Sequence, residues 1–123
     1  MDLQLPGGPM APRLAREAVS SLREQVPPGL LDDVRLVITE LVTNSILHRS
    51  VGPMDEVHVR IRIGESSVTM EVEDPGHGAP SKPSPREDQS GGWGLFLVDR
   101  LADRWGVREG PPALVWAELR ASA

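Results

Sequence analysis

Apolar and polar residues alternate along the middle of the chain, which is the pattern of a strand with one buried face. One run covers residues 57–63, and after the turn residues 64–66 the alternation resumes over residues 68–72. So short a connection predicts two antiparallel neighbouring strands. A shorter alternation over residues 3–5 predicts an edge strand, and residues 114–119 predict a final strand.

Apolar residues at steps of three and four predict three helices, over residues 10–26, 30–49 and 94–105. The residues of the three apolar stripes are Leu14, Ala18, Leu22 and Val26, then Leu31, Val34, Ile38, Leu41 and Ser45, and finally Leu95, Val98, Leu101, Ala102 and Trp105. Strands and helices in this order predict an α+β fold, a two-layer sandwich with helices packed on one face of a mixed, mostly antiparallel sheet.

The segment between Asp74 and Gly92 is rich in proline and glycine and has no large apolar residue, so we expect a loop. Loops of this length in a small domain are usually functional. We therefore expect residues 79–91 to form a lid. Because 123 residues seldom divide into two packed cores, we expect residues 1–123 to form a single domain.

Composition and charge exclude several functions. With 39% hydrophobic and 25% charged residues, the chain is expected to be a soluble globular protein without a membrane partner. A net charge of −5 argues against direct nucleic-acid binding, which needs a basic face. The absence of cysteine excludes disulfides and thiolate metal sites and fits a cytoplasmic protein. Lys82 is the only lysine and precedes Pro83, so no phosphate-binding P-loop is present.

Three polar residues, Glu40, Asn44 and His48, recur at steps of four on the second predicted helix and form a row beside its apolar stripe. A carboxylate, an amide oxygen and an imidazole in a row can activate a hydroxyl, complete the shell of a cation such as Mg²⁺, and contact phosphate. A solvated helix edge would show the same spacing, so this row alone does not decide between a site and a surface.

Two glycine-containing segments flank the predicted lid. The first, residues 74–78, follows a strand, where the Asp74 carboxylate can accept a hydrogen bond from an amine. The second, residues 91–95, opens a helix whose free N–H groups can bind phosphate. An ordinary turn and a structural helix start remain the alternatives for the two segments.

The order of these three segments resembles a known family. Residues 40–48, 74–78 and 92–95 look like the N box and the two glycine boxes of the ATP-binding fold of gyrase and histidine kinases, the Bergerat fold. Within it, the chain is most similar to small anti-sigma-factor serine kinases and related ATPase-like regulators of the actinomycete type. The resemblance covers nearly the whole chain.

The resemblance implies a role for each matching residue. It implies that Glu40 is the general base, that Asn44 binds Mg²⁺, and that Asp74 contacts the adenine amine. The positions that it assigns to ATP binding are Asn44, His48, Asp74, Gly76, Gly78, Gly92, Gly94 and Leu95.

The activity that the resemblance implies is ATP-dependent phosphorylation of a serine on an anti-sigma antagonist, combined with binding of a sigma factor. A second copy of the chain is a further candidate partner. Many relatives have basic residues where this chain has Trp93 and Ala113. Because phosphoryl transfer depends on neutralising charge, a non-catalytic nucleotide-binding module whose lid switches partner affinity remains the alternative.

Overall fold

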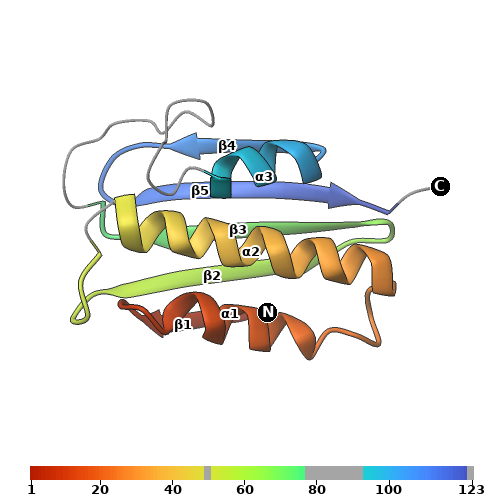
Figure 1. Cartoon of the computed structure of the whole chain (residues 1–123), viewed down its shortest axis with the longest axis horizontal. Helices are drawn as coiled ribbons and strands as arrows, with labels where there is room; N and C mark the ends of the chain where they lie inside the picture. Colours follow the sequence, from red (N-terminus) through yellow and green to blue (C-terminus); the bar gives the residue numbers. More distant parts are fainter. Residues whose placement is uncertain (49–50, 77–92, 122–123) are drawn as a thin grey trace.

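The computed structural model describes residues 1–48, 51–76 and 93–121 (Figure 1). In chain order the elements are β1 (Asp2–Pro6), α1 (Ala11–Ser20), α2 (Pro28–His48), β2 (Glu56–Ile63), β3 (Ser67–Asp74), α3 (Trp93–Leu101), β4 (Arg104–Arg108) and β5 (Ala113–Arg120). The predicted strands and helices occur in this order, and β4 lies where no strand range was predicted.

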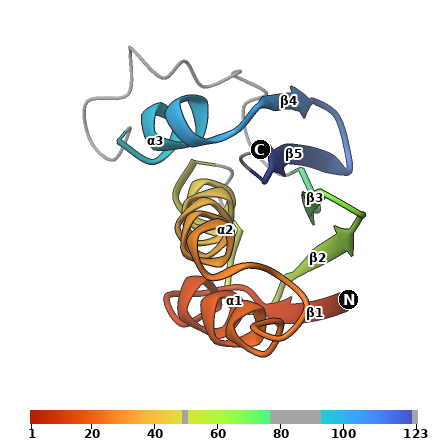
Figure 2. The ribbon, with the colours of Figure 1, turned by 90° about the vertical axis from the view of Figure 1, so that its right-hand side faces the viewer.

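The five strands form one sheet in the order β1-β2-β3-β5-β4, and each of the four described pairings is antiparallel. Figure 2 shows the three helices side by side on one face of this sheet. The predicted α+β sandwich is therefore confirmed. Its core lies between α2 and the central strands, and its largest fully buried side chains include Ile38, Leu41, Ile61, Met70 and Leu119.

The sheet face opposite the helices carries charged side chains. Arg60 of β2 lies 3.0 Å from Glu71 of β3, and Arg104 of β4 lies 3.5 Å from Glu118 of β5. Both pairs face each other in the strand register. Cross-strand pairs of opposite charge stabilise a sheet modestly, which suits a face that none of the described helices covers.

Helix α1 is shorter than the sequence predicted, because it ends at Ser20 and not near Val26. The Ser21 hydroxyl donates to the Ala18 carbonyl at 2.6 Å, and the Leu22 N–H bonds to the Val19 carbonyl, so the last turn tightens and the helix stops. Leu22 and Val26 are still buried, but from turns. Both side chains reach the core although the backbone of these residues is not helical.

Helix α3 also ends earlier than predicted, at Leu101. Trp105 belongs to strand β4, where it pairs with Ala117 of β5. The prediction failed because the Asp103 N–H bonds to the Glu118 carbonyl, which starts strand pairing directly after the helix. The Trp105 indole still reaches back to α3 and donates to the Asp99 carboxylate at 2.9 Å.

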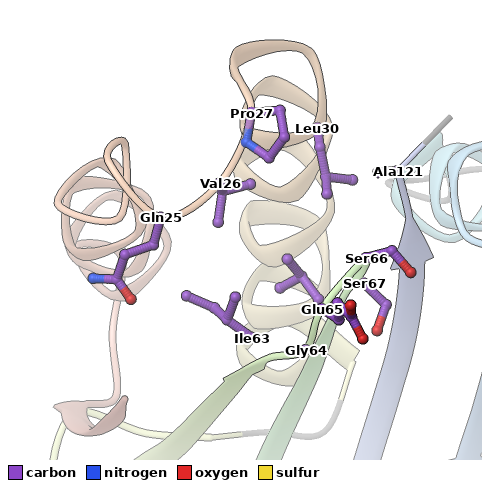
Figure 3. Close-up of a pocket in the computed structure, with 11 residues that line it drawn as sticks. Gln25, Val26, Pro27, Leu30, Ile63, Gly64, Glu65, Ser66, Ser67 and Ala121 are labelled. Atoms are coloured by element: carbon purple, nitrogen blue, oxygen red, sulfur yellow. The ribbon is translucent and has the colours of Figure 1, made fainter. Parts of the chain in front are cut away.

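Helix α2 begins at Pro28, two residues earlier than predicted, and proline suits a helix start because its missing N–H costs nothing there. This end of α2 lies over the turn between β2 and β3, where a cavity of about 90 Å³ separates the two (Figure 3). Its walls include Pro27 and Leu30 on one side and Ser67 and Val68 on the other. Helix α2 therefore starts beside the end of the sheet where β3 starts.

Candidate active site

The carboxyl-terminal half of α2 contains two buried polar side chains. Asn44 is 4% exposed and Ser45 is fully buried. Neither the two polar atoms of the Asn44 amide nor the Ser45 hydroxyl has a hydrogen-bond partner among the described residues. Because buried polar groups in native proteins are nearly always hydrogen-bonded, these atoms point to a site that binds something polar.

Glu40 lies one turn before Asn44 and is half-buried. Burial raises the pKa of its carboxyl above the ordinary value, since removal from water disfavours the charged form. A carboxylate with a raised pKa takes up a proton more readily, which is the property required of a general base. The structure thus shows that burial raises the pKa of Glu40, and its role as the general base stays a prediction.

We expect the substitution Glu40→Gln to raise the free energy of unfolding at pH 7 and to leave it nearly unchanged at pH 4. The raised pKa means that the folded state binds more protons than the unfolded state between the ordinary and the raised pKa of Glu40. The contribution of Glu40 to the free energy of unfolding is therefore lost as the pH rises through the raised pKa. The uncharged glutamine side chain of the variant does not lose a proton, so the variant avoids this loss. Urea unfolding at both pH values measures the difference.

The control is Glu24→Gln, which changes an exposed glutamate in the connection after α1. It should have little effect at either pH. Equal behaviour of the two variants at pH 7 would mean that burial of Glu40 does not destabilise its charge.

Asp74 ends strand β3 and is 3% exposed. One carboxylate oxygen accepts a hydrogen bond from the Gly76 N–H at 2.8 Å. This local bond closes a turn, and it also fixes the carboxylate at the edge of the sheet. Asp74 is thus a buried, oriented acceptor, as recognition of an amine requires.

Gly76 has a backbone φ of +78°, which favours glycine over other residues. A side chain at this position would also clash with the backbone carbonyl oxygen of Gly110 in the turn between β4 and β5. The turn around Gly110 therefore packs directly against the backbone of the loop that follows Asp74. Sequence reasoning did not find this contact.

Helix α2 and strand β3 bring these groups to the same end of the molecule, because both run from the cavity described above in the same direction (Figure 1). A rise of about 1.5 Å per residue places Ser45 about 26 Å along the axis from Pro28. A rise of about 3.3 Å per residue places Asp74 about 23 Å from Ser67. The buried polar residues of α2 thus lie over the end of β3 that carries Asp74.

The remaining predicted residues are placed in part. His48 is the last residue of α2, with a side chain outside the described part. Gly94 is the second residue of α3, and Leu95 is 2% exposed. Gly78, Gly92 and the predicted lid at residues 79–91 lie outside the described residues.

The described residues contain no group of three or more histidines, cysteines and carboxylates that could hold a metal ion. A magnesium ion needs fewer protein ligands, because it keeps waters and takes phosphate oxygens as ligands. The buried Asn44 oxygen fits one such ligand position.

None of the helices in the described ranges combines the length and the apolar character needed to cross a membrane.

Comparison with known proteins gives one family. A family model described as a histidine kinase-like ATPase domain matches residues 8–117. An anti-sigma F factor of Pasteuria penetrans is 31% identical over 110 residues, which cover 79% of this chain and 73% of that protein. A serine-protein kinase RsbW of Listeria innocua is 28% identical over 118 residues, with coverages of 84% and 75%.

Other matches cover less of the related protein. An anti-sigma F factor of Clostridium botulinum is 31% identical over 90 residues, which span 63% of its length. Among solved structures, a histidine kinase domain from Erythrobacter litoralis is 24% identical with a TM-score of 0.58, and the match covers 73% of this chain and 44% of that one. This last likeness concerns the fold alone.

Proposed function

Because the chain belongs to the family of histidine kinase-like ATPase domains, we propose that it is an ATP-binding regulator that acts as a protein serine/threonine kinase of the anti-sigma type. Its relatives named anti-sigma F factor and serine-protein kinase support this reading. The proposal assigns ATP and Mg²⁺ to the end of the sheet where α2 and β3 meet. The single domain and the lid at residues 79–91 are part of it.

The observation that carries the proposal is the buried Asn44 amide. Its two polar atoms have no hydrogen-bond partner among the described residues. Asn44 also lies one turn from Glu40 on the same helix. Burying a polar side chain costs free energy unless the side chain finds a partner. A ligand that accepts its hydrogen bond or is coordinated by it would supply that partner. Asn44 is expected to hold Mg²⁺, which would neutralise charge on the phosphates.

Glu40 is assigned the chemical step. In the proposed reaction the oxygen of a serine side chain forms a bond to the γ-phosphorus of ATP, the bond to ADP breaks, and the serine proton passes to the Glu40 carboxylate. The raised pKa of Glu40 favours this proton uptake. Asp74 would accept a hydrogen bond from the adenine amine, which fixes the nucleotide for the reaction.

A non-catalytic nucleotide-binding module is the second candidate function. The observation that favours it is Ala113, which pairs with Asp74 in the sheet and is 1% exposed, so the start of β5 offers no cation to the site. The Arg100 guanidinium lies over the exposed Phe96 ring of α3, with its carbon 5.8 Å from the ring centroid. Such a module would bind ATP and change partner affinity without transferring phosphate.

The partners and the location follow the same proposal. A sigma factor and a serine-containing antagonist are the expected protein partners, because the relatives carry anti-sigma names. Control of transcription through the sigma factor, a second copy of the chain as a partner and a cytoplasmic location belong to this proposal as well.

We expect ATP with Mg²⁺ to raise the melting temperature of the purified protein by roughly 10 °C. A ligand at one hundred times its dissociation constant adds about 2.7 kcal/mol to the free energy of unfolding. For a domain of this size that free energy corresponds to a shift of roughly 10 °C or more. Thermal unfolding with ATP, with ADP and without Mg²⁺ measures it, and an unchanged melting temperature with both nucleotides would contradict the proposed function.

A further inference from the structure

Strand β4 forms one edge of the sheet and pairs with a strand on one side only. The strand order ends in β5-β4, so among the described residues no further strand lies beyond β4 (Figure 1). An edge strand presents N–H and C=O groups that have no partner in the sheet, and another extended segment can pair with them. The opposite edge, β1, ends in Pro6, whose missing N–H weakens such pairing. Strand β4 contains no proline.

The two faces of β4 differ in their chemistry, because successive side chains of a strand point to opposite faces. Trp105 and Val107 point to the helix side, where they pack against the core and stay partly exposed. Arg104 and Arg108 are exposed and point to the open face of the sheet. The edge therefore combines an apolar row on one face with a positively charged row on the other.

Contacts within the domain hold the side chains of this edge in place. The Trp105 indole donates to the Asp99 carboxylate at 2.9 Å, which fixes its ring beside α3. On the open face, a side chain at Gly106 would place its first carbon 2.9 Å from the Trp116 indole nitrogen, so that ring lies against the Gly106 backbone. The Arg104 guanidinium carbon lies 5.8 Å from the centroid of the same ring. Side chains that are already ordered lose less entropy when a partner docks.

We propose that β4 is a docking site for an extended segment of a partner protein, which adds one more strand to the sheet. Its side chains alternate, with acidic residues opposite Arg104 and Arg108 and apolar residues against Trp105 and Val107. Arg108 contributes most of the charge recognition, because it has no ion-pair partner among the described residues. Arg104, in contrast, already lies 3.5 Å from Glu118. This docking goes beyond the proposed function, since it needs no nucleotide.

A second copy of β4 fits this edge less well than an acidic strand does. Two antiparallel copies that pair about Gly106 would place Arg104 of each copy opposite Arg108 of the other. Like charges directly opposite each other destabilise a strand pair, and opposite charges stabilise it. Charge complementarity therefore favours a different, acidic chain as the occupant.

The test is an NMR titration of the whole protein with a short synthetic peptide whose central residues are Glu-Val-Thr-Val-Glu. The acidic residues stand at both ends, so the pattern is the same in either strand direction. We expect the peptide to bind with or without ATP. The substitution Arg108→Glu should weaken binding by about two- to thirtyfold, because one attractive cross-strand pair becomes repulsive. A peptide with lysine in place of both glutamates should bind this variant better than it binds the wild type.

Arg23→Glu is the matched control for net charge. Arg23 is an exposed arginine in the connection after α1, so its substitution changes the net charge by the same amount as Arg108→Glu. Because charges far from the contact are screened by salt, this variant should bind the acidic peptide within about twofold of the wild type. Equal weakening by the two substitutions, or absence of binding by the wild type, would overturn the inference.

Amide hydrogen exchange in residues 104–108 shows whether the peptide binds at the edge of the strand. Pairing with a new strand should slow exchange of the outward N–H groups of β4, whereas contact with the open face alone would leave exchange unchanged and contradict the inference. Slower exchange at rising protein concentration without peptide would identify a second copy as the occupant and would also overturn it. Failure of the protein to bind ATP would contradict the proposed function and leave this docking site standing.

Discussion

Replacing Glu40 with glutamine is expected to lower the rate of phosphoryl transfer to an antagonist serine by about 10²- to 10⁴-fold, the usual contribution of a general base. Glutamine keeps the size of the side chain but has no carboxylate to accept the serine proton. Because the base acts in the chemical step, the affinity for ATP should stay within a few-fold of the wild type. Transfer of labelled phosphate to a candidate antagonist, together with ATP titration, measures both quantities.

Asn44→Ala provides the contrast, since it changes a neighbour on the same helix. It should weaken the part of ATP binding that depends on Mg²⁺, and it should lower the transfer rate through that loss. Full kinase activity of Glu40→Gln would show that another group takes the proton. Absence of transfer by the wild-type protein with every antagonist tested, in spite of ATP binding, would favour the non-catalytic module.

The substitution Gly76→Ala is expected to weaken ATP binding by about ten- to a hundredfold, the range for a hydrogen bond to a charged group. A methyl group here meets the Gly110 carbonyl oxygen, and alanine at a φ of +78° is strained. The turn must move, and its bond from the Gly76 N–H to the Asp74 carboxylate is then lost. Calorimetric titration with ATP measures the change.

Gly8→Ala is the matched control for backbone strain. Gly8 has a φ of +127°, but an added methyl group would lie in open space. Both variants should lose about 1–3 kcal/mol of stability from strain. Only Gly76→Ala should also lose affinity for ATP. Equal ATP binding by the two variants would show that the turn around Gly76 does not position Asp74.

Most of the fold could be predicted from the sequence because the apolar spacing is regular where elements are long. The strands β2 and β3 and the helix α2 were predicted to within a few residues. The ends of α1 and α3 could not be predicted in this way. After α1, the Ser21 side chain bonds to the helix backbone, and after α3, strand pairing begins at Asp103. Neither interaction changes the spacing of apolar residues in the sequence.

The candidate site was predictable where a residue type is chemically unusual for its place. Glu40, Asn44 and Asp74 were selected as candidates because polar residues stood at the border of an apolar stripe or at a strand end. Ser45 was counted as core because serine is small and its spacing fitted. The contact between Gly76 and Gly110 joins two turns far apart in the sequence, so it required the three-dimensional structure.

The pairing of β3 with β5 determines when during folding the site can form. Strands β2 and β3 are joined by a short turn and can pair early, because closing a short loop costs little entropy. The pairing of Asp74 with Ala113 instead joins residues separated by a long stretch of chain. This pairing positions the loop that Gly110 holds in place. We therefore expect the proposed nucleotide site to form only after this long-range pairing, and later than the pairing of β2 with β3.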